Sequence, residues 1–225
     1  MPMLRTPRGL TAQGFSLQLN AYVVVKYGSN YSIHWVQDAL VVVGGQYWFQ
    51  GEMDVTNYIG SSKNLIYEGG ECMLGCLETP PMSGLLVITV NSTDYGVVIN
   101  FGYALLQLGN ETFSPRIIWF THGLIPIPNA TAYIITSPVR GPYDWPMDTE
   151  FVIGGPGNGG GVTFRDLNAY LSLYYWNGTS WAPYPITYTF GISTGEYAVN
   201  VHALPIGPAS VELTTGGNNY QQLNN

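Results

Sequence analysis

The alternation of apolar and polar residues along this chain predicts β-strands. Residues 15–20, Phe-Ser-Leu-Gln-Leu-Asn, alternate strictly, and residues 21–25, Ala-Tyr-Val-Val-Val, are continuously apolar. This pattern is typical of a half-buried strand that continues into a fully buried one. Similar segments predict further strands at residues 32–43, 47–55, 85–90, 96–108, 116–120, 131–136, 150–153, 169–176 and 197–204.

Turn residues separate these segments. The chain contains 28 Gly and 15 Pro, and they divide it at the spacing of about 8–12 residues that is typical of all-β sandwiches. No segment shows a sustained helical period with capping residues. We therefore predict an all-β fold, an antiparallel β-sandwich of the jelly-roll or concanavalin-like type, with one or two packed sandwiches.

The domain organisation follows from the same pattern. A chain of 225 residues fits one domain or two small β-domains. We expect an N-terminal arm at residues 1–14, a β-domain at residues 15–215 and a polar tail at residues 216–225, which is frayed or serves as a linker. The proline-rich segment 138–146 would be the boundary if the β-domain is divided.

Charged residues make up only 9% of the chain, against about 25% in a typical globular protein. The 14 acidic and 7 basic residues give a formal net charge of -7. Seven scattered Lys and Arg exclude a basic stripe for nucleic acid. In acid the 7 Lys and Arg plus 3 His leave a charge of about +10, and few native ion pairs would be lost. The composition therefore fits an acidic habitat, and equally an uncharged exported protein without an acid requirement.

Two features indicate an extracellular protein. Cys72 and Cys76, the two cysteines of the chain, are spaced to close a small disulfide loop; a zinc site is a poor alternative, because two thiolates are too few ligands. The pattern Asn-X-Ser/Thr, the acceptor for N-glycosylation in exported proteins, occurs at Asn30, Asn91, Asn110, Asn129 and Asn177.

The first ten residues contain Arg5 and Arg8 but no apolar segment, so they are not a complete signal peptide. We expect either that the numbering begins after processing or that the export segment is missing from the chain. Apolar runs such as residues 84–90 are too short to span a bilayer, so we expect no transmembrane segment.

Several sequence motifs match known catalytic patterns only superficially. The glycine-rich run 154–161 lacks the Lys-Ser/Thr of a phosphate loop and is expected to be a wide connection between strands. Residues 191–195, Gly-Ile-Ser-Thr-Gly, match a nucleophile elbow, but no Asp follows Ser193 and an α/β frame is absent. His34, His122 and His202 form no zinc-binding pattern. We expect neither a metal nor a cofactor.

The remaining candidates are carboxylates and an amide within apolar segments. They are Asp148 and Glu150 before Phe-Val-Ile, Glu196 within Thr-Gly-Glu-Tyr-Ala-Val, and the neighbours Gln37 and Asp38. Desolvation raises the pKa of a carboxyl group, and paired acids share a proton, so either arrangement provides an acid or base that works in acidic medium. The alternative is that each lies at a strand end and is satisfied by backbone donors.

At these same places the sequence resembles the thermopsin family of exported archaeal acid proteases. Three segments carry the resemblance: Ser-Ile-His-Trp-Val-Gln-Asp-Ala at residues 32–39, the acidic strand with its glycine loop at residues 148–161, and the succession from residue 164 to residue 200. The resemblance covers most of residues 15–202 and is looser between residues 68 and 142. It implies hydrolysis of peptide bonds at acidic pH without a metal or cofactor.

A weaker similarity to the glutamic peptidases, whose β-sandwich uses a Glu with a Gln, suggests roles for the candidates. By this similarity Glu196 activates water, Gln37 positions the water and stabilises the developing oxyanion, and Asp148 or Glu150 is the second acid. The prediction is that Glu196→Gln abolishes acid proteolysis and leaves the fold intact.

Two further functions remain open from the sequence. One is a non-catalytic exported β-protein that serves as a surface-coat or filament subunit, with further copies of itself as partners. The other is a carbohydrate-binding module, since aromatic β-faces stack on sugars. For the protease, the partner is a protein or peptide substrate.

Overall fold

In the computed structural model, the described residues are 3–5, 14–44, 46–54, 64–67, 82–136, 139–140, 146–157, 159–186 and 195–216. Their regular structure consists of β-strands, β1 to β20, arranged in several sheets that are mostly antiparallel. The predicted all-β class is therefore confirmed. The jelly-roll or concanavalin-like arrangement stays a prediction, as does the division of the chain into arm, domain and tail.

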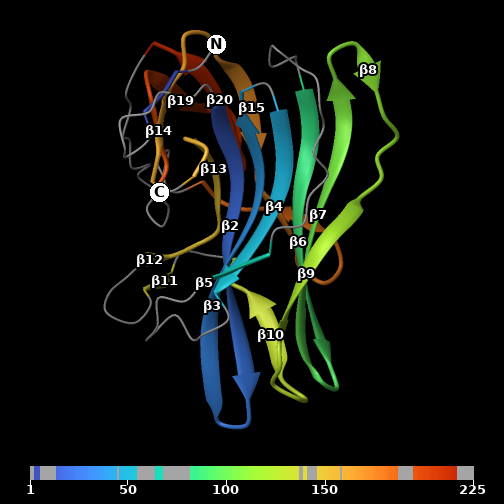
Figure 1. Cartoon of the computed structure of the whole chain (residues 1–225). Coiled ribbons are helices and arrows are strands. Elements are labelled where there is room, and N and C mark those ends of the chain that lie inside the picture. Colours follow the sequence, from blue (N-terminus) through green and yellow to red (C-terminus); the bar gives the residue numbers. More distant parts are fainter. Residues whose placement is uncertain are drawn as a thin grey trace.

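The largest sheet has six strands and is built around a long hairpin (Figure 1). Its strands are β2 (Gly14–Tyr27), β3 (Asn30–Val43), β4 (Gln46–Asp54), β5 (Asn64–Tyr67), β10 (Thr131–Ile134) and β13 (Glu150–Gly154). The order is β10-β2-β3-β4-β5, and β13 pairs with the same edge of β2 as β10 does, further along the strand. Gly28 has a φ of 59° in the turn between β2 and β3, a conformation that glycine adopts without steric cost.

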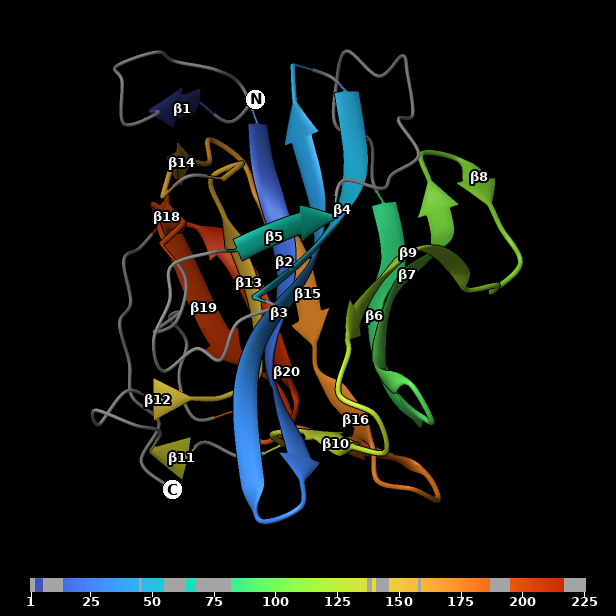
Figure 2. The ribbon, with the colours of Figure 1, turned by 60° about the horizontal axis from the view of Figure 1, so that its bottom comes forward.

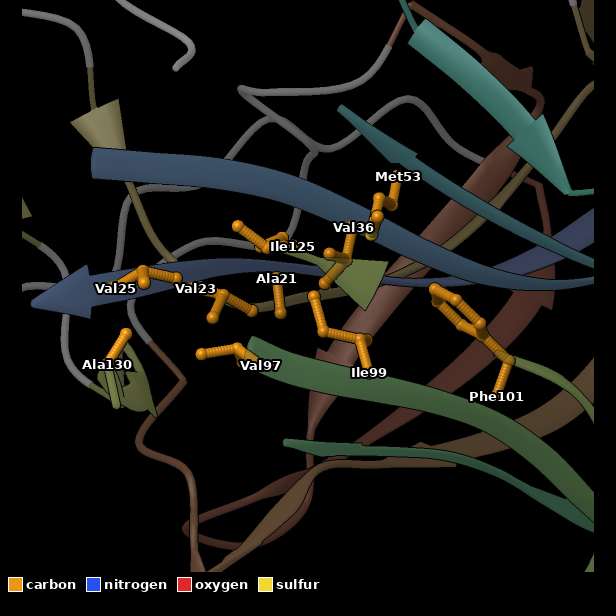
Figure 3. Packing of buried hydrophobic residues seen from close by; sticks show 10 residues of the cluster. All are labelled: Ala21, Val23, Val25, Val36, Met53, Val97, Ile99, Phe101, Ile125 and Ala130. Carbon is orange, nitrogen blue, oxygen red and sulfur yellow. The ribbon is translucent and has the colours of Figure 1, made fainter. Parts of the chain in front are cut away.

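A second sheet contains β6 (Met82–Thr93), β7 (Gly96–Leu108), β8 (Glu111–Thr112) and β9 (Ile118–Ile125), with β7 paired to the other three. This sheet faces β2, β3 and β4 across the main core (Figure 3). Alternate residues of both sheets fill the space between them, namely Ala21, Val23, Val25, Val36, Met53, Val97, Ile99, Phe101 and Ile125. Ala130, in the connection between β9 and β10, completes the cluster. The continuously apolar run of β2 thus has its odd-numbered residues in this core.

Smaller sheets complete the described fold. They are formed by β1 (Met3–Arg5), β14 (Gly161–Thr163) and β18 (Tyr197–Val199); by β15 (Asn168–Ser172), β20 (Ser210–Thr215) and β19 (Val201–Pro205); by β11 (Val139–Arg140) and β12 (Pro146–Met147); and by β16 (Tyr174–Trp176) and β17 (Trp181–Pro183). The pairing of β14 with β18 is parallel. Figures 1 and 2 place β18 and β19 on the β13 side of the large sheet, away from β6, β7 and β9.

A second core cluster joins the C-terminal strands to the large sheet. The rings of Phe15 and Phe164 meet edge to face with centroids 5.8 Å apart, and Val162 packs in the same cluster. Further along this cluster, Phe49 of β4 stacks on Tyr103 of β7 with centroids 3.6 Å apart. Ile153 of β13, which is paired with the edge of β2, packs against the same cluster.

Some strand boundaries differ from the predicted ones. The segment 169–176 is two strands, because the N–H of Leu173 bonds to Ala209 and its carbonyl accepts from Tyr184, so the chain changes sheets there. The segment 197–204 is also divided, at Asn200, whose φ is 63°. The segment 116–120 corresponds to β9, which extends to Ile125 because its pairing with β7 continues. Eight strands were not expected from the sequence: β1, β5, β8, β11, β12, β14, β17 and β20.

Candidate active site

A row of polar residues crosses four strands of the large sheet. Glu150 of β13 lies opposite Asn20 of β2, Asn20 lies opposite Gln37 of β3, and Gln37 lies opposite Glu52 of β4. Residues directly opposite each other in antiparallel strands have neighbouring side chains on one face of the sheet. We call this side the polar face, in contrast to the core face that packs on β7.

The polar face of β2 is buried. The alternation of Ser16, Gln18 and Asn20 with apolar residues predicted that one face of this strand is exposed to solvent, yet all three side chains are buried. The expectation of a half-buried strand was therefore wrong for this segment. Buried polar groups are stable only when they are hydrogen-bonded, and the three residues take part in one connected network.

This network runs along the face as a chain of side-chain hydrogen bonds. Ser16 Oγ donates to the carbonyl oxygen of Gly155 at 2.6 Å, and Gln18 Nε2 donates to Ser16 Oγ at 2.8 Å. Gln37 Nε2 donates to Gln18 Oε1 at 3.1 Å and to Asn20 Oδ1 at 2.9 Å. The two protons of the Gln37 amide are thus both used within the network.

Asn20 is the member of the network with a free donor. Its side chain is 1% exposed, and within the described part of the chain its Nδ2 has no hydrogen-bond partner. Its Oδ1 is held by Gln37, which sets the orientation of the amide. The free donor belongs to the residue that lies opposite Glu150.

Two carboxyl groups occupy the β13 end of the row. Asp148 is 5% exposed and Glu150 is 8% exposed. Burial, together with the negative charge of Glu150, raises the pKa of Asp148 to about 7. Two neighbouring carboxyl groups in a dry site cannot both ionise easily, so such a pair holds a shared proton in acid. This arrangement combines a proton donor and a proton acceptor in one place.

A buried tyrosine lies beside the two acids. The hydroxyl oxygen of Tyr184 accepts a hydrogen bond from the backbone N–H of Thr149 at 3.1 Å, and the residue between the two acids is thereby fixed. Burial raises the pKa of Tyr184 to about 12, with smaller contributions from the charges of Asp148 and Glu150. The phenol therefore keeps its proton throughout the acidic range.

Glu196 lies at a different part of the same edge. Its Oε1 accepts a hydrogen bond from the N–H of Gly159 at 3.1 Å, and a Cβ added to Gly154 would lie 2.9 Å from the Cβ of Glu196. Gly154 is opposite Ser16, whereas Gln37 is opposite Asn20. Glu196 therefore lies beside the level of Ser16 on β2, whereas Gln37 lies at the level of Asn20. These two levels are four residues apart along β2, a separation of about 13 Å.

The neighbours Gln37 and Asp38 belong to opposite faces of the sheet. Asp38 lies on the core face, fully buried, and its Oδ2 accepts a hydrogen bond from the N–H of Val87 on β6 at 3.1 Å. Burial raises its pKa well above the ordinary value, so the group is protonated in acid. Asp38 thus connects the two sheets. Although Gln37 and Asp38 are neighbours in the sequence, Gln37 belongs to the candidate site and Asp38 belongs to the core.

The other described residues that the sequence singled out lie apart from this row. Cys72 and Cys76 are outside the described residues. The five glycosylation acceptors that the sequence predicts, namely Asn30, Asn91, Asn110, Asn129 and Asn177, are all exposed. His34 hydrogen-bonds to Ser32 Oγ and to the carbonyl of Asp54. In the part of the chain that the structure describes, no three His, Cys, Asp or Glu gather as metal ligands, and no helix is long and apolar enough to cross a membrane.

Comparison with known proteins identifies the family. The family model described as Thermopsin matches residues 4–201. The chain belongs to the thermopsin family. A curated relative, the thermopsin of Sulfolobus acidocaldarius, is 32% identical over 139 residues, which are 58% of this chain and 41% of the relative. The chain thus spans less than half the length of that thermopsin. No solved structure matches this thermopsin-family chain.

Sequence reasoning missed four residues of the site: Ser16, Gln18, Asn20 and Tyr184. The signal for the first three was present, because three uncharged polar residues alternate along one strand and such residues satisfy one another when buried. The pattern did not say which face of the strand would be covered. Tyr184 had no distinguishing signal among the 17 tyrosines of the chain.

Proposed function

We propose that this protein is an acid endopeptidase that acts outside the cell. Membership of the thermopsin family supports this function, as do the exposed glycosylation acceptors. The observation that carries the proposal is the pair of buried carboxyl groups, Asp148 and Glu150, beside a network of buried amides.

The pair supplies the proton transfers of peptide hydrolysis. In acid one carboxyl group is protonated and the other is ionised. The ionised group takes a proton from water while the water oxygen bonds to the peptide carbonyl carbon, and the protonated group gives its proton to the carbonyl oxygen. The C–N bond then breaks: the first group protonates the departing nitrogen, and the second takes a proton from the tetrahedral intermediate. The pair ends with one proton, as it began.

The pH dependence follows from the raised pKa. The pKa of Asp148 is about 7, so the proton donor of the pair is present at every pH well below that value. Above it, both groups ionise and the proton donor is lost. Proteolysis is therefore expected in acid and is expected to disappear as the pH rises through about 7.

Glu196 is the alternative water-activating residue, by the similarity to the glutamic peptidases. It lies beside the glycine-rich segment, and a substrate bound along the edge of β13 would meet both carboxylate positions. Substitution of single residues distinguishes the two assignments.

The test is digestion of casein at about pH 3 by the unsubstituted chain and by Asp148→Asn, Glu150→Gln and Glu196→Gln. Loss of at least about 100-fold in rate is expected for the first two variants, with an unchanged far-ultraviolet circular dichroism spectrum. Asp166→Asn, at an exposed position, is the matched control and should retain full activity.

These assays test the protease function and the assignment of the catalytic residues separately. A wild-type protein without proteolysis at any acidic pH contradicts the function. Full activity of both Asp148→Asn and Glu150→Gln, with loss in Glu196→Gln, contradicts the carboxyl pair and supports Glu196 as the base.

A second candidate function, a surface-coat or filament subunit, is favoured by exposed aromatic side chains near β16 and β17. Trp176 and Trp181 lie opposite each other, both exposed, with ring centroids 5.8 Å apart. Sedimentation at about pH 3 distinguishes the functions: large polymers without casein digestion support the subunit, and an active protein of low mass supports the protease.

A further inference from the structure

The orientation of the Asn20 amide assigns different tasks to the two central residues of the row. Gln37 Nε2 has two protons, and these are directed to Gln18 Oε1 and Asn20 Oδ1. A substrate carbonyl would have to break one of these bonds to be held by Gln37. The role of oxyanion donor that the similarity to glutamic peptidases gives to Gln37 therefore conflicts with its hydrogen bonds.

Asn20 has the complementary arrangement. Because Oδ1 accepts from Gln37, the amide is turned so that Nδ2 is the remaining polar atom. That atom is buried and has no partner among the described residues, an arrangement that stable interiors generally avoid. The neighbour opposite Asn20 on its other side is Glu150, so the free N–H and the carboxyl pair belong to the same end of the row.

We infer that Asn20 is a further catalytic residue, whose Nδ2 donates a hydrogen bond to the carbonyl oxygen of the scissile peptide bond. Gln37 and Gln18 are positioning residues, which hold the Asn20 amide in the orientation that leaves this donor free. The inference rests on the proposed acid endopeptidase function. A fixed donor aimed at a developing oxyanion stabilises the transition state more than the ground state.

The geometry also gives the order of events at the carbonyl oxygen. The Asn20 N–H polarises the carbonyl as the water oxygen attacks, and the protonated member of the Asp148 and Glu150 pair then delivers its proton to the same oxygen. No covalent bond to Asn20 forms or breaks, so the proton balance of the hydrolysis is unchanged.

Two substitutions of Asn20 test the inference. Asn20→Leu removes the donor and has nearly the same size as asparagine. We expect kcat on a quenched fluorescent peptide at about pH 3 to fall by about 100- to 1,000-fold, with KM changed little. The melting temperature should not fall in proportion to kcat, because the substitution removes a buried donor without a partner together with the Gln37 contact.

Asn20→Asp keeps an acceptor and, when protonated, an O–H donor. We expect this variant to retain activity in strong acid and to lose it at a lower pH than wild type, because ionisation removes the donor and adds a negative charge opposite Glu150. A purely structural role for Asn20 would not shift the upper limb of the pH profile. If Asn20→Leu does not fold, this profile decides the question.

Asn100→Leu is the matched control. Asn100 lies on β7, and its Nδ2 donates to Thr89 Oγ1 at 3.1 Å, so this amide belongs to another sheet. Its substitution should leave kcat within about twofold of wild type. An active wild type whose kcat and pH profile are unaltered in both Asn20 variants overturns the inference and leaves the function standing. An inactive wild type overturns the function and the inference with it.

Discussion

The buried carboxyl group of Asp38 predicts that this fold is most stable in acid. Asp38 is 0% exposed on the core face of β3, and it accepts a hydrogen bond from Val87 of the facing sheet at 3.1 Å. Its Oδ1 has no partner among the described residues. Ionisation would place a charge between two sheets, which is costly without a counter-ion. The substitution Asp38→Asn removes the titrating group and preserves its size and an oxygen acceptor for Val87.

The expected magnitude follows from proton linkage. The unfolded chain has the ordinary Asp pKa, near 3.8, and the folded pKa of Asp38 is well above it. Between these two values the folded state binds more protons than the unfolded state, so the free energy of unfolding falls as the pH rises. The decrease reaches about 1.4 kcal/mol per pH unit, so two units within this window remove up to about 2.7 kcal/mol.

The assay is urea unfolding, followed by tryptophan fluorescence, at several pH values from about 4 to 6. Asp148 has a raised pKa of about 7 and contributes a slope of the same sign, so the comparison is made in an Asp148→Asn background. We expect the double variant Asp38→Asn, Asp148→Asn to lose most of the remaining pH slope. Parallel stability curves for the single and the double variant would refute the assignment of this slope to Asp38.

Two packing predictions follow from the same structure. Gly154→Ala should lower the free energy of unfolding by about 1–3 kcal/mol, because the added Cβ would lie 2.9 Å from the Cβ of Glu196; thermal unfolding measures this, and an unchanged melting temperature would contradict the close approach. Phe49→Ala should cost about 3–5 kcal/mol, because the ring is buried and stacks on Tyr103, whereas Phe113→Ala at an exposed position should stay within about 0.5 kcal/mol of wild type; equal costs would contradict the described core.

The candidate site was predictable in part. Asp148 and Glu150 stand out in the sequence because so few charged residues interrupt its apolar strands. Gln37 was assigned a role through the resemblance to known families. The structure places Glu150 and Gln37 on either side of Asn20, although Glu150 and Gln37 are 113 residues apart in the sequence. Strand order decides this neighbourhood, and strand order depends on long-range pairing that no local pattern encodes. Glu196 and Gln37 were expected together, but Glu196 lies beside Gly154, which is opposite Ser16, whereas Gln37 is opposite Asn20.

The sequence by itself determined the β class, because apolar alternation and frequent turn residues are local properties of the chain. It also determined the scarcity of charge, which makes each buried acid conspicuous. Only the tertiary structure decided which face of β2 is covered and therefore that Ser16, Gln18 and Asn20 form an interior network. A period of two residues separates the faces of a strand, but the sheets and segments that pack on each face determine which face is dry.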